Sequence, residues 1–153
     1  MRREDKQITD TDGLHHVITQ AMVCRVALVN DNRPYLIPLN FGFDGKHLYF
    51  HSAAGGKKVD ILKKNNHVCI EFEQDIRIVE NEKPCEWGAH YFTVIIHGTA
   101  ELVNDLDEKR YGLDQIVKHH IASNTQYPFA DKEVNSVLVY RVTIDQIIGK
   151  KSG

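Results

Sequence analysis

The segment best suited to ligand binding runs from His51 to Lys58, with the sequence His-Ser-Ala-Ala-Gly-Gly-Lys-Lys. It joins an expected strand to an expected helix, and Gly55 and Gly56 allow the backbone to approach a ligand closely. The start of a helix carries free N–H groups and partial positive charge, so it attracts anions. Lysines are unfavourable at that end of an isolated helix, so Lys57 and Lys58 are easier to explain if an anion such as phosphate binds there. The alternative is that both lysines are solvated after an ordinary turn.

Three neighbouring side chains extend this hypothesis. Ser52 would add a hydroxyl donor, and Arg25 could reach the same anion from a neighbouring strand. His51 ends its strand beside the loop, where it is either a cofactor or substrate contact or a half-exposed strand residue. Because the pKa of histidine lies near neutrality, His51 is also the candidate acid or base. The segment lacks the G-x-x-x-x-G-K-[ST] pattern, so a nucleoside-triphosphate P-loop is not indicated.

The apolar stretch from Pro34 to Phe41 contains a further proline, Pro38, inside the expected strand. Proline removes one backbone donor and would leave an interruption in the hydrogen-bond ladder. A flat ligand could use that gap by bonding to nearby backbone groups. Taken alone, the stretch favours the simpler explanation that the strand lies at the edge of a sheet.

The remaining histidines, serines and cysteines fit no catalytic or metal-binding pattern. The nine histidines include two adjacent pairs, which cannot both face one site on a helix, and no H-E-x-x-H or Cys/His spacing predicts a zinc site. Ser52 lacks a G-x-S-x-G context, and no cysteine has an identifiable partner histidine. Cys24 and Cys69 lie in apolar runs and are expected to be buried and reduced, whereas Cys85 lies in a polar stretch and could be exposed.

Two further pairs of side chains have an ordinary structural explanation. Glu71 and Glu73 share one face of an expected strand and are expected to face solvent rather than to form a glycosidase pair. Trp87 and Tyr91 flank the loop before a long strand. Packing onto the rest of the protein is the default expectation for these aromatics, and stacking on a planar ligand is the alternative.

Composition places the chain among ordinary globular proteins. It has 153 residues, of which 42% are hydrophobic and 26% charged, and this suits a single domain over residues 1–153. The net charge of -2 lacks the basic footprint of a nucleic-acid-binding protein. The first residues contain no apolar signal region, and no apolar run approaches the ~20 residues of a membrane span. We therefore expect a soluble, cytoplasmic protein with neither nucleic-acid nor membrane partners.

The elements that must position these residues are mostly strands. Hydrophobic spacing predicts strands over 23–29, 35–43, 47–52, 67–79, 91–103 and 134–148. It also predicts helices over 14–21 with Asp10 or Thr11 as the cap, over 57–66, and over 106–120 with Asp105 as the cap. Residues 81–87 and 127–131 are expected loops. Antiparallel strands with few inserted helices indicate a mainly β fold with helical insertions, a decorated β-barrel.

The order of these segments resembles a known superfamily over nearly the whole chain. The matching stretches are residues 23–28, 34–43, 48–53 with 56–58, 66–71 and 147–153, while residues 85–91 match only loosely. The chain resembles the flavin-binding split barrels typified by pyridoxamine 5'-phosphate oxidase, and within them the nitroimidazole-resistance (Nim) proteins.

That resemblance implies a six-stranded antiparallel split β-barrel that forms a homodimer and binds FMN in two clefts at the subunit interface. It implies that Arg25, Ser52, Lys57 and Lys58 hold the phosphate, and that the backbone of residues 37–40 lies against the isoalloxazine ring. The residues assigned in this way to the cofactor site are Arg25, Val26, Ile37, Pro38, Leu39, Asn40, His51, Ser52, Ala53, Gly56, Lys57, Lys58, Trp87 and Tyr91, with Trp87 or Tyr91 coming from the partner subunit.

The implied activity is an oxidoreductase that passes electrons from a reduced donor to a small organic acceptor, such as a nitro-aromatic compound. His51 is the candidate catalytic residue. Two alternatives stay open. The superfamily also includes haem-binding and haem-degrading members, in which a histidine such as His51 would ligate iron. The protein could also bind flavin without turnover, and the visible absorption spectrum with FMN or haem separates these possibilities.

Overall fold

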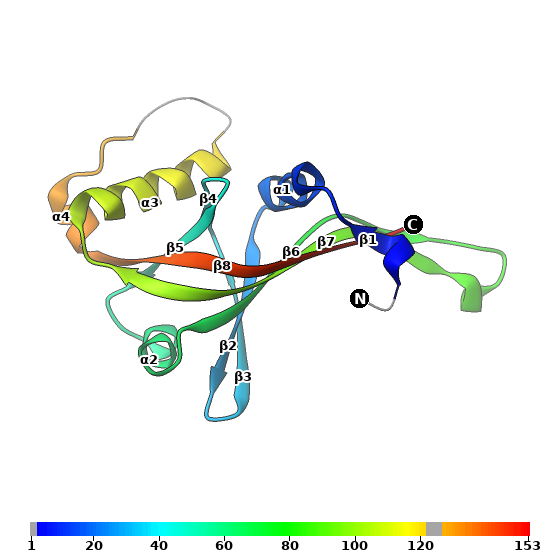
Figure 1. The fold of residues 1–153 in the computed structure, drawn as a ribbon, viewed down its shortest axis with the longest axis horizontal. Helices are drawn as coiled ribbons and strands as arrows, with labels where there is room; N and C mark the ends of the chain where they lie inside the picture. Colours follow the sequence, from blue (N-terminus) through cyan, green and yellow to red (C-terminus); the bar gives the residue numbers. More distant parts are fainter. Residues whose placement is uncertain (1–2, 122–126) are drawn as a thin grey trace.

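The computed structural model describes residues 3–121 and 127–153 and consists of one curled antiparallel sheet with helices around it (Figure 1). In chain order the elements are the 3₁₀ turn η1 (Glu4–Lys6), β1 (Gln7–Ile8), α1 (Thr11–Gln20), β2 (Cys24–Asn30), β3 (Arg33–Leu39), β4 (Gly42–Phe43), β5 (His47–Ala53), α2 (Lys57–Lys64), β6 (His67–Val79), the 3₁₀ turn η2 (Pro84–Glu86), β7 (Gly88–Val103), α3 (Leu106–His120), α4 (Asp131–Asn135) and β8 (Val137–Ser152).

The strand order is β3-β2-β6-β7-β8-β5-β4, with β1 paired to β8, and every pairing is antiparallel. The sheet has eight strands rather than the expected six, because β1 and β4 are additional strands of two residues each. The six longer strands form the predicted split barrel, so the predicted fold class is confirmed.

The split lies between the free edges of β3 and β5. Strand β3 ends the sheet, so one of its edges has no neighbouring strand in the part of the chain that the structure describes. On its second edge, β5 pairs with β4 only at Leu48 and Tyr49. Within the described residues, the backbone from Phe50 to Ala53 therefore pairs with β8 alone. Two strand edges thus carry backbone groups that pair with no described strand.

Alternating burial fixes which face of each strand points into the barrel. On β2, Cys24, Val26 and Leu28 are buried, whereas the intervening Arg25 and Ala27 lie on the outer face. The barrel core is filled by large side chains such as Phe41, Phe50 and Phe72. A second apolar cluster, formed by Tyr49, Val103, Leu113, Ile116, Val134 and Val139, packs α3 and α4 against the outside of β5 and β8.

The predicted helix starts are confirmed by side-chain caps. The Asp10 carboxylate accepts a hydrogen bond from the Gly13 N–H at 2.7 Å, which starts α1. The Asp105 carboxylate accepts bonds from the N–H groups of Asp107 and Glu108 at 3.1 and 2.9 Å, which starts α3. Of the described helices, none is long and apolar enough to cross a bilayer.

Two strand predictions need correction. Strand β3 runs without a break through Pro38 and ends at Leu39, so the interruption falls at residues 40–41 rather than at the proline. Pro38 pairs with Arg25 at the sheet edge, which confirms the edge-strand explanation. The strand predicted over 134–148 begins later, at Val137, because residues 131–135 form helix α4, in which the Glu133 carboxylate accepts a bond from the Ala130 N–H at 2.8 Å.

Candidate functional site

The first two residues of α2 contact opposite walls of the split. The Lys57 amine lies 4.6 Å from the centroid of the Tyr35 ring on β3. The Lys58 amine donates a hydrogen bond to the His51 carbonyl on β5 at 3.1 Å and lies 5.5 Å from the centroid of the Phe50 ring. Burial lowers the pKa of the Lys58 amine, although nearby Cys24 opposes this shift. The structure therefore places one amine of the α2 N-terminus against β3 and the other against β5.

The N-terminus of α2 differs from those of α1 and α3. It follows Gly56, which has φ 117° and ψ 170°, and no described side chain caps its N–H groups. This backbone conformation is essentially restricted to glycine. A Cβ built on Gly55 or Gly56 would meet nothing within 4 Å, so the space above the loop is open. The uncapped N–H groups and the two lysines together form a site suited to an external anion.

His51 and Ser52 point to opposite faces of β5. The His51 side chain shares the face of Tyr49 toward α3, whereas Ser52 shares the inner face of Phe50 and is only 8% exposed. Partial burial lowers the pKa of the His51 imidazole, and the positive charge of Lys58 lowers it further. The imidazole is therefore neutral at pH 7, which suits a hydrogen-bonding or proton-accepting role.

Arg25 lies on the outer face of the sheet and binds two carboxylates. Its guanidinium reaches Glu71 at 3.1 Å and Glu73 at 2.7 Å. The glutamates are half-buried in this ion pair, whereas the sequence predicted that they face solvent. Cys24 points the other way, into the barrel, and its thiol contacts the Leu39 carbonyl at 3.5 Å. Arg25 is thus engaged on the face opposite to Cys24.

The predicted residues of β2 and β3 divide between the two faces. Val26 is fully buried, and Ile37 and Leu39 pack against the barrel core. These three residues can offer only backbone groups to a ligand, as the resemblance implied for Ile37 and Leu39. Pro38 and Asn40 are exposed.

Trp87 and Tyr91 lie far from α2 within one chain. The hairpin of β6 and β7 carries both residues and extends to the opposite end of the molecule from α2 (Figure 1). The Trp87 indole donates a hydrogen bond to the Asn81 carbonyl at 2.9 Å, and its side chain stays largely exposed. The Lys150 amine lies 5.4 Å from the centroid of the Tyr91 ring. Neither aromatic joins the lysines of α2 in a single chain.

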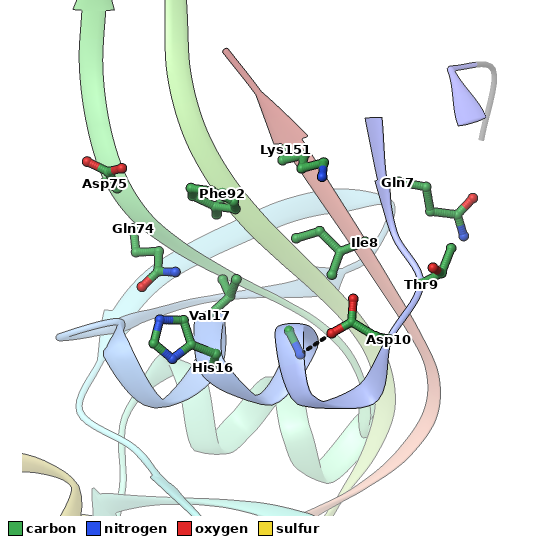
Figure 2. Close-up of a pocket in the computed structure, with 11 residues that line it drawn as sticks. Gln7, Ile8, Thr9, Asp10, His16, Val17, Gln74, Asp75, Phe92 and Lys151 are labelled. Carbon is green, nitrogen blue, oxygen red and sulfur yellow. Dashed lines mark hydrogen bonds between the residues drawn. The ribbon is translucent and has the colours of Figure 1, made fainter. Parts of the chain in front are cut away.

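Two cavities were not found by sequence reasoning. One of about 310 Å³ lies beside His51 under α3 and α4. A larger one of about 480 Å³ lies between α1, β1 and the strands β6, β7 and β8 (Figure 2). Ile8, Val17 and Phe92 provide its apolar side, and Asp75 lines it from an irregular point of β6 with φ 51°. Both cavities combine segments distant in sequence, so no local motif could have predicted them.

Metal and thiol chemistry find no support in this arrangement. Among residues 3–121 and 127–153, no three histidine, cysteine, aspartate or glutamate side chains converge to hold a metal ion. Burial raises the pKa of the Cys24 thiol to about 12, so the thiolate is not available at neutral pH. Cys24 is buried as predicted, Cys69 is only half-buried, and Cys85 is exposed.

Comparison with known proteins identifies relatives of this fold. The family model described as pyridoxamine 5'-phosphate oxidase matches residues 10–151. A protein of Bacteroides thetaiotaomicron VPI-5482, assigned provisionally to 5-nitroimidazole antibiotic resistance, is 33% identical; the match covers 95% of this chain and 86% of that one, with a TM-score of 0.84. The FAD and heme binding protein from Mycobacterium smegmatis is 26% identical, with 96% and 73% covered and a TM-score of 0.87.

More distant structures share the architecture. The flavocytochrome Anf3 from Azotobacter vinelandii is 19% identical. The match covers 100% of this chain and 72% of that chain, with a TM-score of 0.86. Among curated protein sequences, none matches the chain.

Proposed function

Because the chain belongs to the pyridoxamine 5'-phosphate oxidase family, we propose that it is a flavoprotein whose cofactor phosphate binds at the start of α2. The observation that carries this proposal is the position of Lys57 and Lys58. Their amines contact the two walls of the split, at Tyr35 and at the His51 carbonyl, directly beside an uncapped helix N-terminus. Charge-assisted hydrogen bonds to phosphate are strong, and both lysines are within one residue of the free N–H groups.

The residues present fit an FMN molecule. The amines of Lys57 and Lys58 and the first N–H groups of α2 would hold the phosphate, above the open space at Gly56. The last residues of β3 and the following Asn40 would lie against the flavin ring, since the edge of β3 away from β2 pairs with no described strand. When bound, the flavin would supply electron-transfer chemistry that no side chain of the protein can provide. Arg25 would reach the phosphate only by leaving Glu71 and Glu73.

The reaction that we propose is reduction of a small organic acceptor such as a nitro-aromatic compound. Its first step consumes two electrons and two protons, Ar–NO₂ + 2 e⁻ + 2 H⁺ → Ar–NO + H₂O, and the electrons come from a reduced donor such as NADPH or dithionite. Reduction to the amine requires six electrons and six protons in all. His51, neutral at pH 7, would accept a hydrogen bond from a protonated group or exchange a proton with the acceptor.

We propose a homodimer with the cofactor at its interface. In one chain the hairpin that carries Trp87 and Tyr91 extends away from α2, so these aromatics could complete a flavin site only in a second subunit (Figure 1). Haem is the alternative cofactor, favoured by the relative from M. smegmatis that binds both FAD and heme. Visible spectra recorded after addition of FMN, and separately of haem, decide between the two cofactors. A flavin band would indicate FMN, and a Soret band would indicate haem.

The decisive experiment compares two lysine pairs on the same helix. Replacing Lys57 and Lys58 by alanine should weaken FMN binding at least 100-fold, since each of the two charge-assisted bonds contributes about 1.5–3 kcal/mol. The matched control replaces Lys63 and Lys64, at the other end of α2, and should leave the Kd unchanged. Quenching of FMN fluorescence gives the Kd. Equal affinities for both double variants would place the phosphate elsewhere.

A further inference from the structure

His51 connects the flavin crevice to a second space on the other side of β5. Its carbonyl faces the split, where it binds Lys58, while its side chain lines the cavity of about 310 Å³. The wall opposite the histidine is built from Leu113, Ile116 and Val117 of α3. One residue therefore contacts the proposed phosphate site through its carbonyl and lines, through its exposed side chain, an open pocket that the cofactor phosphate does not use.

The rest of the lining is mostly apolar, with the exposed residues Ser136 and Glu133 as its polar members. Phe129 closes it above α4, and Leu113 and Ile116 belong to the buried cluster that holds α3 on the sheet. Glu133 contributes the ionised group among the described lining residues, and its carboxylate is fixed by the hydrogen bond from the Ala130 N–H at 2.8 Å. An anionic ligand would face this negative charge, whereas an uncharged ring would bury apolar surface against α3.

The size of the cavity limits the ligand. Pockets for small molecules range from about 300 to 1,000 Å³, and this one is at the lower end of that range. This volume suits a single ring with one or two substituents. We propose that this cavity is the acceptor-binding pocket, that Val117, Phe129 and Glu133 determine its specificity, and that it selects uncharged single-ring acceptors over anionic ones. This inference rests on the proposed flavoprotein function.

A matched pair of acceptors tests the charge selection. The molecules 4-nitrobenzyl alcohol and 4-nitrobenzoate share one ring and one nitro group and differ in charge at pH 7. With FMN-loaded protein and dithionite or NADPH as donor, kcat/KM should be at least tenfold higher for the alcohol. Glu133→Gln keeps an oxygen for the cap and removes the charge, so the preference should fall about tenfold, as expected for one nearby charge. An equal kcat/KM for both acceptors in the unmodified protein would overturn the proposal.

Filling the cavity tests its location. Val117→Phe should lower kcat/KM for the alcohol at least tenfold while the FMN Kd stays unchanged, because the added ring occupies the acceptor volume and not the phosphate site. Met22→Phe, at a position 80% exposed after α1, is the matched control and should change neither quantity. If Val117→Phe behaves like Met22→Phe, the cavity is not the acceptor pocket.

A binding measurement without flavin separates failure of this proposal from failure of the proposed function. In the flavin-free protein, 4-nitrobenzyl alcohol should shift the NMR resonances of the His51 ring, and Val117→Phe should abolish that shift. If FMN does not bind but these shifts occur, the cavity assignment stands and the cofactor is wrong. If FMN binds and the His51 resonances do not respond to the alcohol, the cavity assignment is wrong.

Discussion

At the scale of single residues, the imidazole of His51 links stability to pH. Its pKa in the folded protein lies below the ordinary value of 6.5, because burial and Lys58 both disfavour the charged form. As the pH falls below 6.5, the unfolded chain therefore binds more protons than the folded chain, and the free energy of unfolding decreases. We expect Tm to fall as the pH decreases through this range, with full stability above it.

The variant His51→Gln isolates this contribution. Thermal unfolding of both proteins between about pH 5 and pH 8 should show a smaller loss of Tm in the variant at the acidic end. The pKa of His120 is also lowered by burial, but its contribution is common to both proteins. Identical pH profiles would mean that His51 is not desolvated in the folded chain.

At the residue scale, the sequence pointed to members of the candidate site where their signal was local, and their role in binding stays a prediction. Lys57 and Lys58 follow a glycine pair at an expected strand–helix junction, and the structure places them together at the split. Arg25 carried no such signal, because its ion pairs with Glu71 and Glu73 depend on the pairing of β2 with β6. Whether Arg25 binds a phosphate or the two glutamates depends on strand pairing between segments that are distant in sequence.

At the scale of elements, the turn before α2 depends on the conformation of Gly56. An alanine there would adopt φ near 117° at a cost of about 1–3 kcal/mol. We expect Gly56→Ala to lower the free energy of unfolding by this amount and to weaken FMN binding, because the helix N-terminus would shift. Urea unfolding and FMN fluorescence measure the two effects.

Gly55→Ala provides the control on the same turn. A Cβ at Gly55 meets nothing within 4 Å, so this variant should keep the stability of the unmodified protein. If both alanine variants are equally stable, the turn does not require the Gly56 conformation.

The predicted elements were accurate where short-range signals exist. Helices α1 and α3 start at the expected aspartate caps, and β2, β5 and β6 follow their hydrophobic patterns. Helix α4 was missed because its N-cap is Ala130, which gives no capping signal, and because Val134 continues the apolar pattern of the next strand. The cavity beside His51 depends on α4, so it could not be predicted either.

At the scale of the whole molecule, the outer face of the sheet is the surface on which we expect two copies to meet. The register aligns Pro38, Arg25, Glu71, Ile95 and Ile148 in one cross-strand row. Ile95 is 36% exposed in the middle of this row, although most isoleucines on the inner face are buried. We expect light scattering to give twice the chain mass, and Ile95→Lys to give the monomer, since a charge in the middle of an interface must lose its hydration.

The control for this substitution lies on the same strand. Leu102 is 42% exposed near the end of β7, beside α2 rather than in the row of Ile95, so Leu102→Lys should leave the dimer intact. If the cofactor lies at the interface, Ile95→Lys should also lose FMN, whereas Leu102→Lys retains it. If the unmodified protein is monomeric and still binds FMN, the partner subunit does not contribute to the cofactor site.

The two free strand edges at the split also bear on aggregation. The backbone of β3 and of residues 50–53 presents donors and acceptors that can pair with a strand of another molecule. The positive charges of Lys57 and Lys58, beside these edges, oppose pairing with another molecule. A bound cofactor would cover the edges further. Cells that produce more chain than cofactor should therefore accumulate insoluble protein, and added riboflavin should raise the soluble yield.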